Sequence, residues 1–169
     1  MTATLKRTGR FSCEVTFETR LSPEATYDYL SDFQKHPEWS SGLVEMTRTS
    51  QGEGGVGMTY RTVEKAAGSK DNTVSEITAL ERPRLIAWKA QTEKPGWPMG
   101  ARSEWSFTIE PSNGGSKVTQ RMELIPASKL LVSGLFFVAD TFFGGTGATP
   151  KAVLRNAERL ESRLAAMAG

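Results

Sequence analysis

The chain has 169 residues, enough for one domain of ordinary size and too few for two. A hydrophobic share of 38% and a charged share of 24% are typical of a globular protein and exclude the disordered, collagen-like and cysteine-framework classes. The net charge is only +2 and the two signs alternate along the chain, which argues against nucleic acid as a partner.

The first part of the chain predicts one strand followed by two short helices. Residues 11–19 alternate apolar and polar side chains, the period of a half-buried strand. Ser22 and Pro23 together predict the start of a helix of about three turns. Pro37 predicts the start of a second short helix. Because the residue before a proline avoids helical backbone, we expect His36 in a loop or at a helix flank.

The remainder predicts strands and then one long helix. Turns rich in glycine, proline and asparagine separate the strands. Near Thr149 the apolar period changes to steps of three and four, which predicts a C-terminal amphipathic helix. No strand–helix–strand alternation is present, so we expect an α+β fold with a curved antiparallel sheet. The expected strands cover residues 44–49, 56–64, 73–80, 85–92, 103–110 and 117–124.

Several of these landmarks resemble the START-like (SRPBCC) superfamily, most nearly its bacterial polyketide cyclase/dehydrase and lipid-transport proteins. The resemblance covers about residues 11–167. It rests on a fairly specific opening signature, a glycine hairpin, a later turn leading to Trp88, and the closing helix. The residues that carry it are Leu21, Ser22, Pro23, Glu24, Ala25, Tyr29, Leu30, Asp32, Phe33, His36, Pro37, Trp39, Gly55, Val56, Gly57, Glu81, Arg82, Pro83, Arg84 and Leu85.

The resemblance implies the helix-grip fold. In that fold a curved seven-stranded antiparallel sheet wraps around a long C-terminal helix, two short helices lie between the first and second strands, and an apolar cavity separates sheet and helix. Members of the superfamily range from passive lipid carriers to cyclases, and they share no catalytic motif to transfer. Fold alone therefore does not settle function, and we assign no catalytic residue.

Strand parity selects the side chains expected to face the cavity. Trp105 and Phe107 share one side of their strand, as do Gln120 and Met122 on the next. Gln120 is the polar member of an apolar face, so it either meets a polar neighbour in the core or orients a ligand oxygen. For the aromatic residues, core packing is the alternative to ligand contact. The expected ligand-binding residues are Tyr60, Trp88, Trp105, Phe107, Gln120 and Met122.

The other reactive residue types are assigned structural roles. One cysteine, Cys13, excludes an internal disulfide, and one histidine, His36, excludes the usual clustered zinc sites, so we expect no metal and no cofactor. His36 has no carboxylate at a motif spacing to make it a general base. Cys13 lies on a strand without a base or helix terminus to lower its pKa, which favours a small core hydrophobe. Residues 144–147 are rich in glycine but lack a phosphate-loop ending, so we expect a joint between helices.

Residues 130–143, from Leu130 to Phe143, form a very apolar segment. It is too short for the ~20 apolar residues of a membrane-spanning helix. It is expected to complete the cavity wall, pack on another subunit, or contact a membrane surface. We hypothesise that this segment, or the loop around Trp97, gates the cavity.

These patterns favour a domain that binds or carries a hydrophobic small molecule such as a lipid, a polyketide or an aromatic metabolite. Affinity would come chiefly from apolar burial at ~25 cal/mol per Å². Two alternatives remain open: a polyketide cyclase or dehydratase, and a protein-interaction module. We expect a single domain over residues 1–169, with a flexible segment over 1–10. The first ten residues are polar and show no secretory signal, so we expect a cytoplasmic location. The identity of the ligand and the oligomeric state are unspecified.

Overall fold

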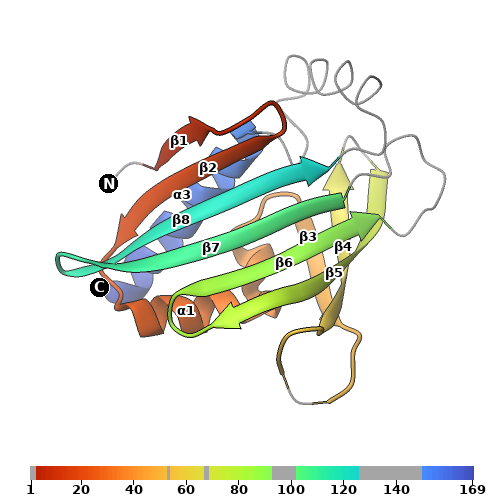
Figure 1. The fold of residues 1–169 in the computed structure, drawn as a ribbon, viewed down its shortest axis with the longest axis horizontal. Coiled ribbons are helices and arrows are strands. Elements are labelled where there is room, and N and C mark those ends of the chain that lie inside the picture. The colour runs from red at the N-terminus through yellow and green to blue at the C-terminus, as the bar shows by residue number, and fades with distance from the viewer. Residues whose placement is uncertain (1–2, 53, 67–68, 93–101, 126–149) are drawn as a thin grey trace.

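The computed structural model describes residues 3–52, 54–66, 69–92, 102–125 and 150–169. Within them the chain forms an eight-stranded antiparallel sheet in the order β1-β2-β8-β7-β6-β5-β4-β3 (Figure 1). The strands are β1 (Thr4–Arg7), β2 (Ser12–Thr19), β3 (Leu43–Arg48), β4 (Thr59–Ala66), β5 (Ser69–Glu81), β6 (Leu85–Thr92), β7 (Arg102–Ser112) and β8 (Gly115–Ile125). The helices are α1 (Pro23–Ser31), the 3-10 helix η1 (Phe33–Glu38) and α3 (Pro150–Ala168).

The predicted α+β helix-grip architecture is confirmed, with one correction to the strand count. The sheet has eight strands instead of the expected seven, because Thr4–Arg7 pairs with β2 and places Leu5 opposite Val15. The sequence gives little sign of this edge strand, since only Leu5 in it is partly buried. The two short helices accordingly follow the second strand, β2, and lead into β3.

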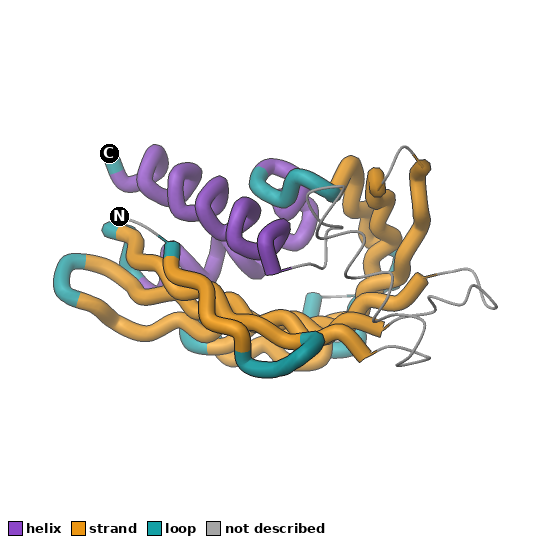
Figure 2. Tube along the Cα trace, turned by 90° about the horizontal axis from the view of Figure 1, so that it is seen from above, coloured by secondary structure: helices purple, strands orange, loops and turns teal. Residues whose placement is uncertain are grey.

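The sheet is curved, and the helices lie on its concave side (Figure 2). Helix α3 packs mainly against β2. Its apolar stripe is buried there, at Val153, Ala157, Leu160 and Leu164. These are residues that the sequence period predicted, whereas Met167, which the same period includes, is exposed near the end of the helix. The long helix thus covers the part of the concave face formed by β1 and β2. No helix within the described residues is long and apolar enough to cross a membrane.

The start of α1 follows the predicted capping chemistry, whereas the second helix does not begin where expected. Ser22 Oγ accepts a hydrogen bond from Ala25 N at 3.2 Å, and Pro23 occupies the first turn. Helix η1 begins at Phe33 and runs through Pro37, so His36 lies inside it and is buried. Tertiary contacts of the His36 ring, described below, outweigh the local effect of the following proline.

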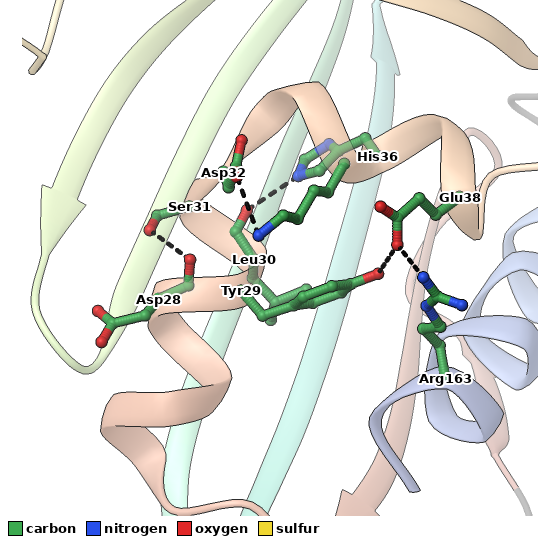
Figure 3. Close-up of polar contacts among 9 residues, drawn as sticks. Asp28, Tyr29, Leu30, Ser31, Asp32, His36, Glu38 and Arg163 are labelled. Atoms are coloured by element: carbon green, nitrogen blue, oxygen red, sulfur yellow. Dashed lines mark hydrogen bonds and ion pairs between the residues drawn. The ribbon is translucent and has the colours of Figure 1, made fainter. Parts of the chain in front are cut away.

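Two groups of hydrogen bonds join α3 to η1 and to the loop that follows it. Asn156 Oδ1 accepts hydrogen bonds from Ser41 N at 3.0 Å and Ser41 Oγ at 2.9 Å, and its Nδ2 donates to Ser40 Oγ at 3.2 Å. Nearer the C-terminus, Tyr29 and Arg163 both donate to Glu38 Oε2 (Figure 3). Asn156 is buried and the Arg163–Glu38 pair is largely exposed, so the amide should contribute more to stability.

Replacing Asn156→Leu should lower the free energy of unfolding by about 2 kcal/mol, because three hydrogen bonds are lost. Arg163→Ala on the same helix is the control, and an exposed pair of this kind should cost less than about 1 kcal/mol. Urea denaturation followed by far-UV circular dichroism measures both values. Equal losses in the two variants would contradict the assignment of Asn156 as the stronger tie.

Candidate ligand-binding site

A cavity of about 90 Å³ lies between η1, the concave face of the sheet and α3. Its floor and walls come from six strands, β3 to β8, and the loop after η1 contributes the remaining side. Because so many elements converge, residues distant in the sequence line one cavity. The described lining residues are His36, Trp39, Ser40, Gly42, Leu43, Met46, Thr62, Glu64, Ser75, Trp88, Ala90, Ser103, Trp105, Gln120 and Asn156.

The register of the central strands fixes which side chains face inward. Trp88 lies opposite Trp105, and Trp105 lies opposite Met122 on β8. One row along, Phe107 lies opposite Gln120. The two indole rings stack, with centroids 6.0 Å apart and planes 7° from parallel. The inner face predicted from strand parity is therefore confirmed for β7 and β8.

Beside the cavity, aromatic rings surround His36. Its imidazole stacks on Phe33 with centroids 4.6 Å apart and lies 4.9 Å from the Trp39 ring. Trp88 and Phe107 contact it edge-on, at 5.5 and 6.3 Å. The histidine is thus part of the aromatic core and not of the loop or helix flank that the sequence predicted.

The six residues expected to bind ligand divide into two groups. Trp88, Trp105 and Gln120 line the cavity. Tyr60, Phe107 and Met122 are buried in the core next to it. Their direct contact with a ligand stays a prediction.

The other lining residues were not singled out as ligand contacts from the sequence; those that lie outside the sheet and carry polar side-chain atoms are His36, Trp39, Ser40 and Asn156. His36 and Trp39 belong to the opening signature of the family resemblance, and this membership was the sequence signal that could have identified them.

Two buried polar atoms of the lining residues have no hydrogen-bond partner within the described structure. They are Oε1 of Gln120, a residue that is 1% exposed, and Nε1 of Trp39, a residue that is 3% exposed. The Trp39 ring lies 5.9 Å from the Phe107 ring, and Phe107 is the cross-strand partner of Gln120. Buried polar groups are normally paired, so two unpaired atoms among the residues that line one cavity require a physical reason.

Comparison with protein families gives a match over residues 10–166 to the model described as polyketide cyclase / dehydrase and lipid transport. The chain belongs to this family. No curated protein matches it significantly by sequence.

Residues 93–101 and 126–149, which include the Trp97 loop, the apolar segment and the glycine run, lie outside the described residues.

Solved structures with the same fold include a START superfamily protein from Mycobacterium smegmatis, with a TM-score of 0.64 and 14% identity over 92% of this chain and 98% of that one. An aromatase/cyclase from Streptomyces sp. R1128 gives a TM-score of 0.65 and 13% identity over 93% and 92%. At such identities the likeness shows the fold alone.

Burial shifts the pKa of two titratable side chains in the core, His36 and Cys13. It lowers the pKa of His36 to about 4, an effect larger than the opposing contributions of the Leu30 carbonyl and Asp32. His36 Nε2 lies 2.9 Å from Leu30 O, so the neutral ring donates its single N–H there (Figure 3). Burial also raises the pKa of Cys13 to about 11, which keeps it a thiol and confirms its role as a core side chain.

Within the described residues no group of three or more His, Cys, Asp or Glu side chains is arranged to hold a metal ion.

Replacing Gln120→Leu should raise the free energy of unfolding by about 1 kcal/mol, because the variant no longer buries an unpaired carbonyl oxygen. The control is Thr26→Val, since Thr26 is buried outside the cavity and its Oγ1 lies 3.2 Å from Ser116 Oγ. That variant should lose about 1 kcal/mol. Thermal and urea unfolding measure both, and a clear destabilisation by Gln120→Leu would show that the amide is paired in the core.

His36 should make the protein less stable in mild acid. Its pKa is about 4 in the folded protein and 6.5 in the unfolded chain, so between these values the unfolded state binds more protons. The stability contributed by the neutral ring is complete above pH 6.5 and is lost as the pH falls to 4, by about 3 kcal/mol. The stability difference between wild type and His36→Phe, measured from pH 8 to 4, isolates this dependence. An NMR titration of the single histidine giving a pKa near 6.5 would refute it.

Proposed function

We propose that the protein binds a hydrophobic small molecule in the cavity between η1, the sheet and α3. The observation that carries this proposal is the unpaired carbonyl oxygen of Gln120 in a cavity with three aromatic side chains beside it and other polar residues that are already paired. Leaving such a group buried and unpaired costs about 1–3 kcal/mol, and a bound ligand that supplies a partner recovers this cost. Membership of the polyketide cyclase / dehydrase and lipid transport family supports the same ligand class.

The cavity size favours a small ligand or a ligand that moves a side chain. Its 90 Å³ is below the roughly 300–1,000 Å³ of pockets for drug-sized molecules. Among the aromatic side chains that line the cavity, Trp105 is the most able to move. It is only partly buried, and its Nε1 is held by one hydrogen bond, to Ser103 Oγ at 2.8 Å. We infer that a single aromatic ring enters as the cavity stands, whereas a fused-ring or acyl ligand displaces this indole.

The six residues predicted from the sequence have two proposed roles. Trp88, Trp105 and Gln120 contact the ligand, because they already line the cavity. Tyr60 and Phe107 hold the surrounding aromatic cluster in place, through ring contacts of 5.2 Å with Phe33 and 5.5 Å with Trp88, respectively. Met122 supports Trp105 from the adjacent strand.

Binding is better supported than the cyclase or dehydratase alternative. Such an enzyme needs a group in the cavity that accepts a proton near neutral pH. Of the described lining residues, His36 and Glu64 carry titratable side chains. The pKa of His36 is about 4, which makes its imidazole a weak base, and Glu64 Oε1 accepts a hydrogen bond from Thr73 Oγ1 at 3.3 Å.

The proposal is tested by filling the cavity. Ala90 faces the cavity from β6, whereas Ala87 faces the opposite side of the same strand. Dodecanoic acid, 2-naphthol and 1,8-dihydroxyanthraquinone serve as lipid, aromatic and polyketide-like probes. Calorimetry and the fluorescence of the cavity tryptophans should show binding of at least one probe, weakened at least tenfold by Ala90→Leu and unchanged by Ala87→Leu.

Two results would contradict the proposal. One is the absence of binding for all three probes together with no co-purified small molecule in native mass spectra. The other is equal weakening by Ala90→Leu and Ala87→Leu, since that would place the probe elsewhere on the protein.

A further inference from the structure

We propose that the ligand carries a hydroxyl group that donates a hydrogen bond to Gln120 Oε1 and accepts one from Trp39 Nε1. This inference rests on the proposed binding function and specifies the chemical class of the ligand: an apolar molecule bearing an alcohol or a phenol. It follows from which polar atoms of the site are already paired and which are not.

The other polar lining residues have partners. Asn156 is bonded to Ser40 and Ser41. On the sheet, Thr62 Oγ1 lies 3.3 Å from Ser75 Oγ, and Ser103 Oγ accepts from Trp105. His36 Nε2 is bonded to the Leu30 carbonyl. In the described lining, the buried atoms left without a partner are therefore Gln120 Oε1 and Trp39 Nε1.

These two atoms need opposite hydrogen-bond partners. An indole N–H only donates, and an amide oxygen only accepts. A ketone or carboxylate ligand accepts alone and would leave Gln120 unpaired, whereas an ammonium group donates alone and would leave Trp39 unpaired. A hydroxyl group both donates and accepts, so its chemistry matches both atoms.

The fold brings both residues to one aromatic ring. Trp39 ends η1 with its ring 5.9 Å from that of Phe107. Gln120 lies directly across from Phe107 on β8, a position at which cross-strand Cβ atoms are about 4.5–5.5 Å apart. Both residues are buried, and in a buried setting each hydrogen bond to a ligand is stronger than in water.

The experiment compares two probes of the same shape, 2-naphthol and 2-methylnaphthalene, by calorimetry. The measured quantity is the ratio of their two dissociation constants. The difference in hydrophobicity between the two probes is the same for wild type and for each variant, so it cancels when the ratios are compared. Losing one hydrogen bond should change this ratio about fivefold against 2-naphthol in Gln120→Leu, and similarly in Trp39→Phe. The control is Thr26→Val, which removes a paired polar group outside the cavity and should leave the ratio unchanged.

A second readout uses the wild-type protein. The indole N–H signal of Trp39, assigned in wild type by through-space contacts with the His36 and Phe107 rings, should move downfield with 2-naphthol and not with 2-methylnaphthalene. This measurement decides the matter even where a variant fails to fold.

The outcomes separate the two proposals. If both probes bind and their ratio is the same in all proteins, a retained water and not the ligand pairs these atoms, and hydroxyl recognition is overturned while binding stands. If neither probe nor the other test compounds bind, the proposed function fails and this inference with it.

Discussion

A curved antiparallel sheet must bury its concave face, and the rest of this structure depends on how that face is covered. One amphipathic helix, α3, covers the part formed by β2 and its neighbours. At the other end the short helices α1 and η1 take its place, and η1 contacts β3. Protein interiors are normally close-packed, yet a space of about 90 Å³ remains where η1, α3 and the sheet meet. The proposed binding site is therefore a consequence of the architecture.

Two kinds of buried polar residue meet at this space, and they behave differently. Asn156 is fully engaged and ties the long helix to the loop after η1. Gln120 and Trp39 each retain an unpaired atom. The first arrangement stabilises the fold, whereas the second lowers stability until a partner arrives. A site that holds unpaired groups in a rigid aromatic frame is prepared for a ligand that completes them.

His36 shows how packing overrides local sequence preference. The proline after it disfavours helical backbone, and the chain nonetheless forms η1 through both residues. Stacking on Phe33, contacts with Trp39 and Trp88, and the hydrogen bond to Leu30 together outweigh that preference. The same burial removes the positive charge from the ring at neutral pH, so the histidine serves as a polar member of an aromatic core.

The sequence by itself determined the α+β class, the strands from β2 onward, the amphipathic C-terminal helix and the inward faces of β7 and β8, because the apolar period and turn residues are local signals. It placed Trp88, Trp105 and Gln120 correctly on the inner face. The edge strand β1 was missed because a strand with one partly buried residue has almost no pattern. Only the tertiary structure decided that Trp39, His36 and Asn156 join the sheet residues around one cavity, and that the Gln120 carbonyl lacks a partner. Contacts between residues far apart in the sequence depend on how elements pack, and no local pattern encodes them.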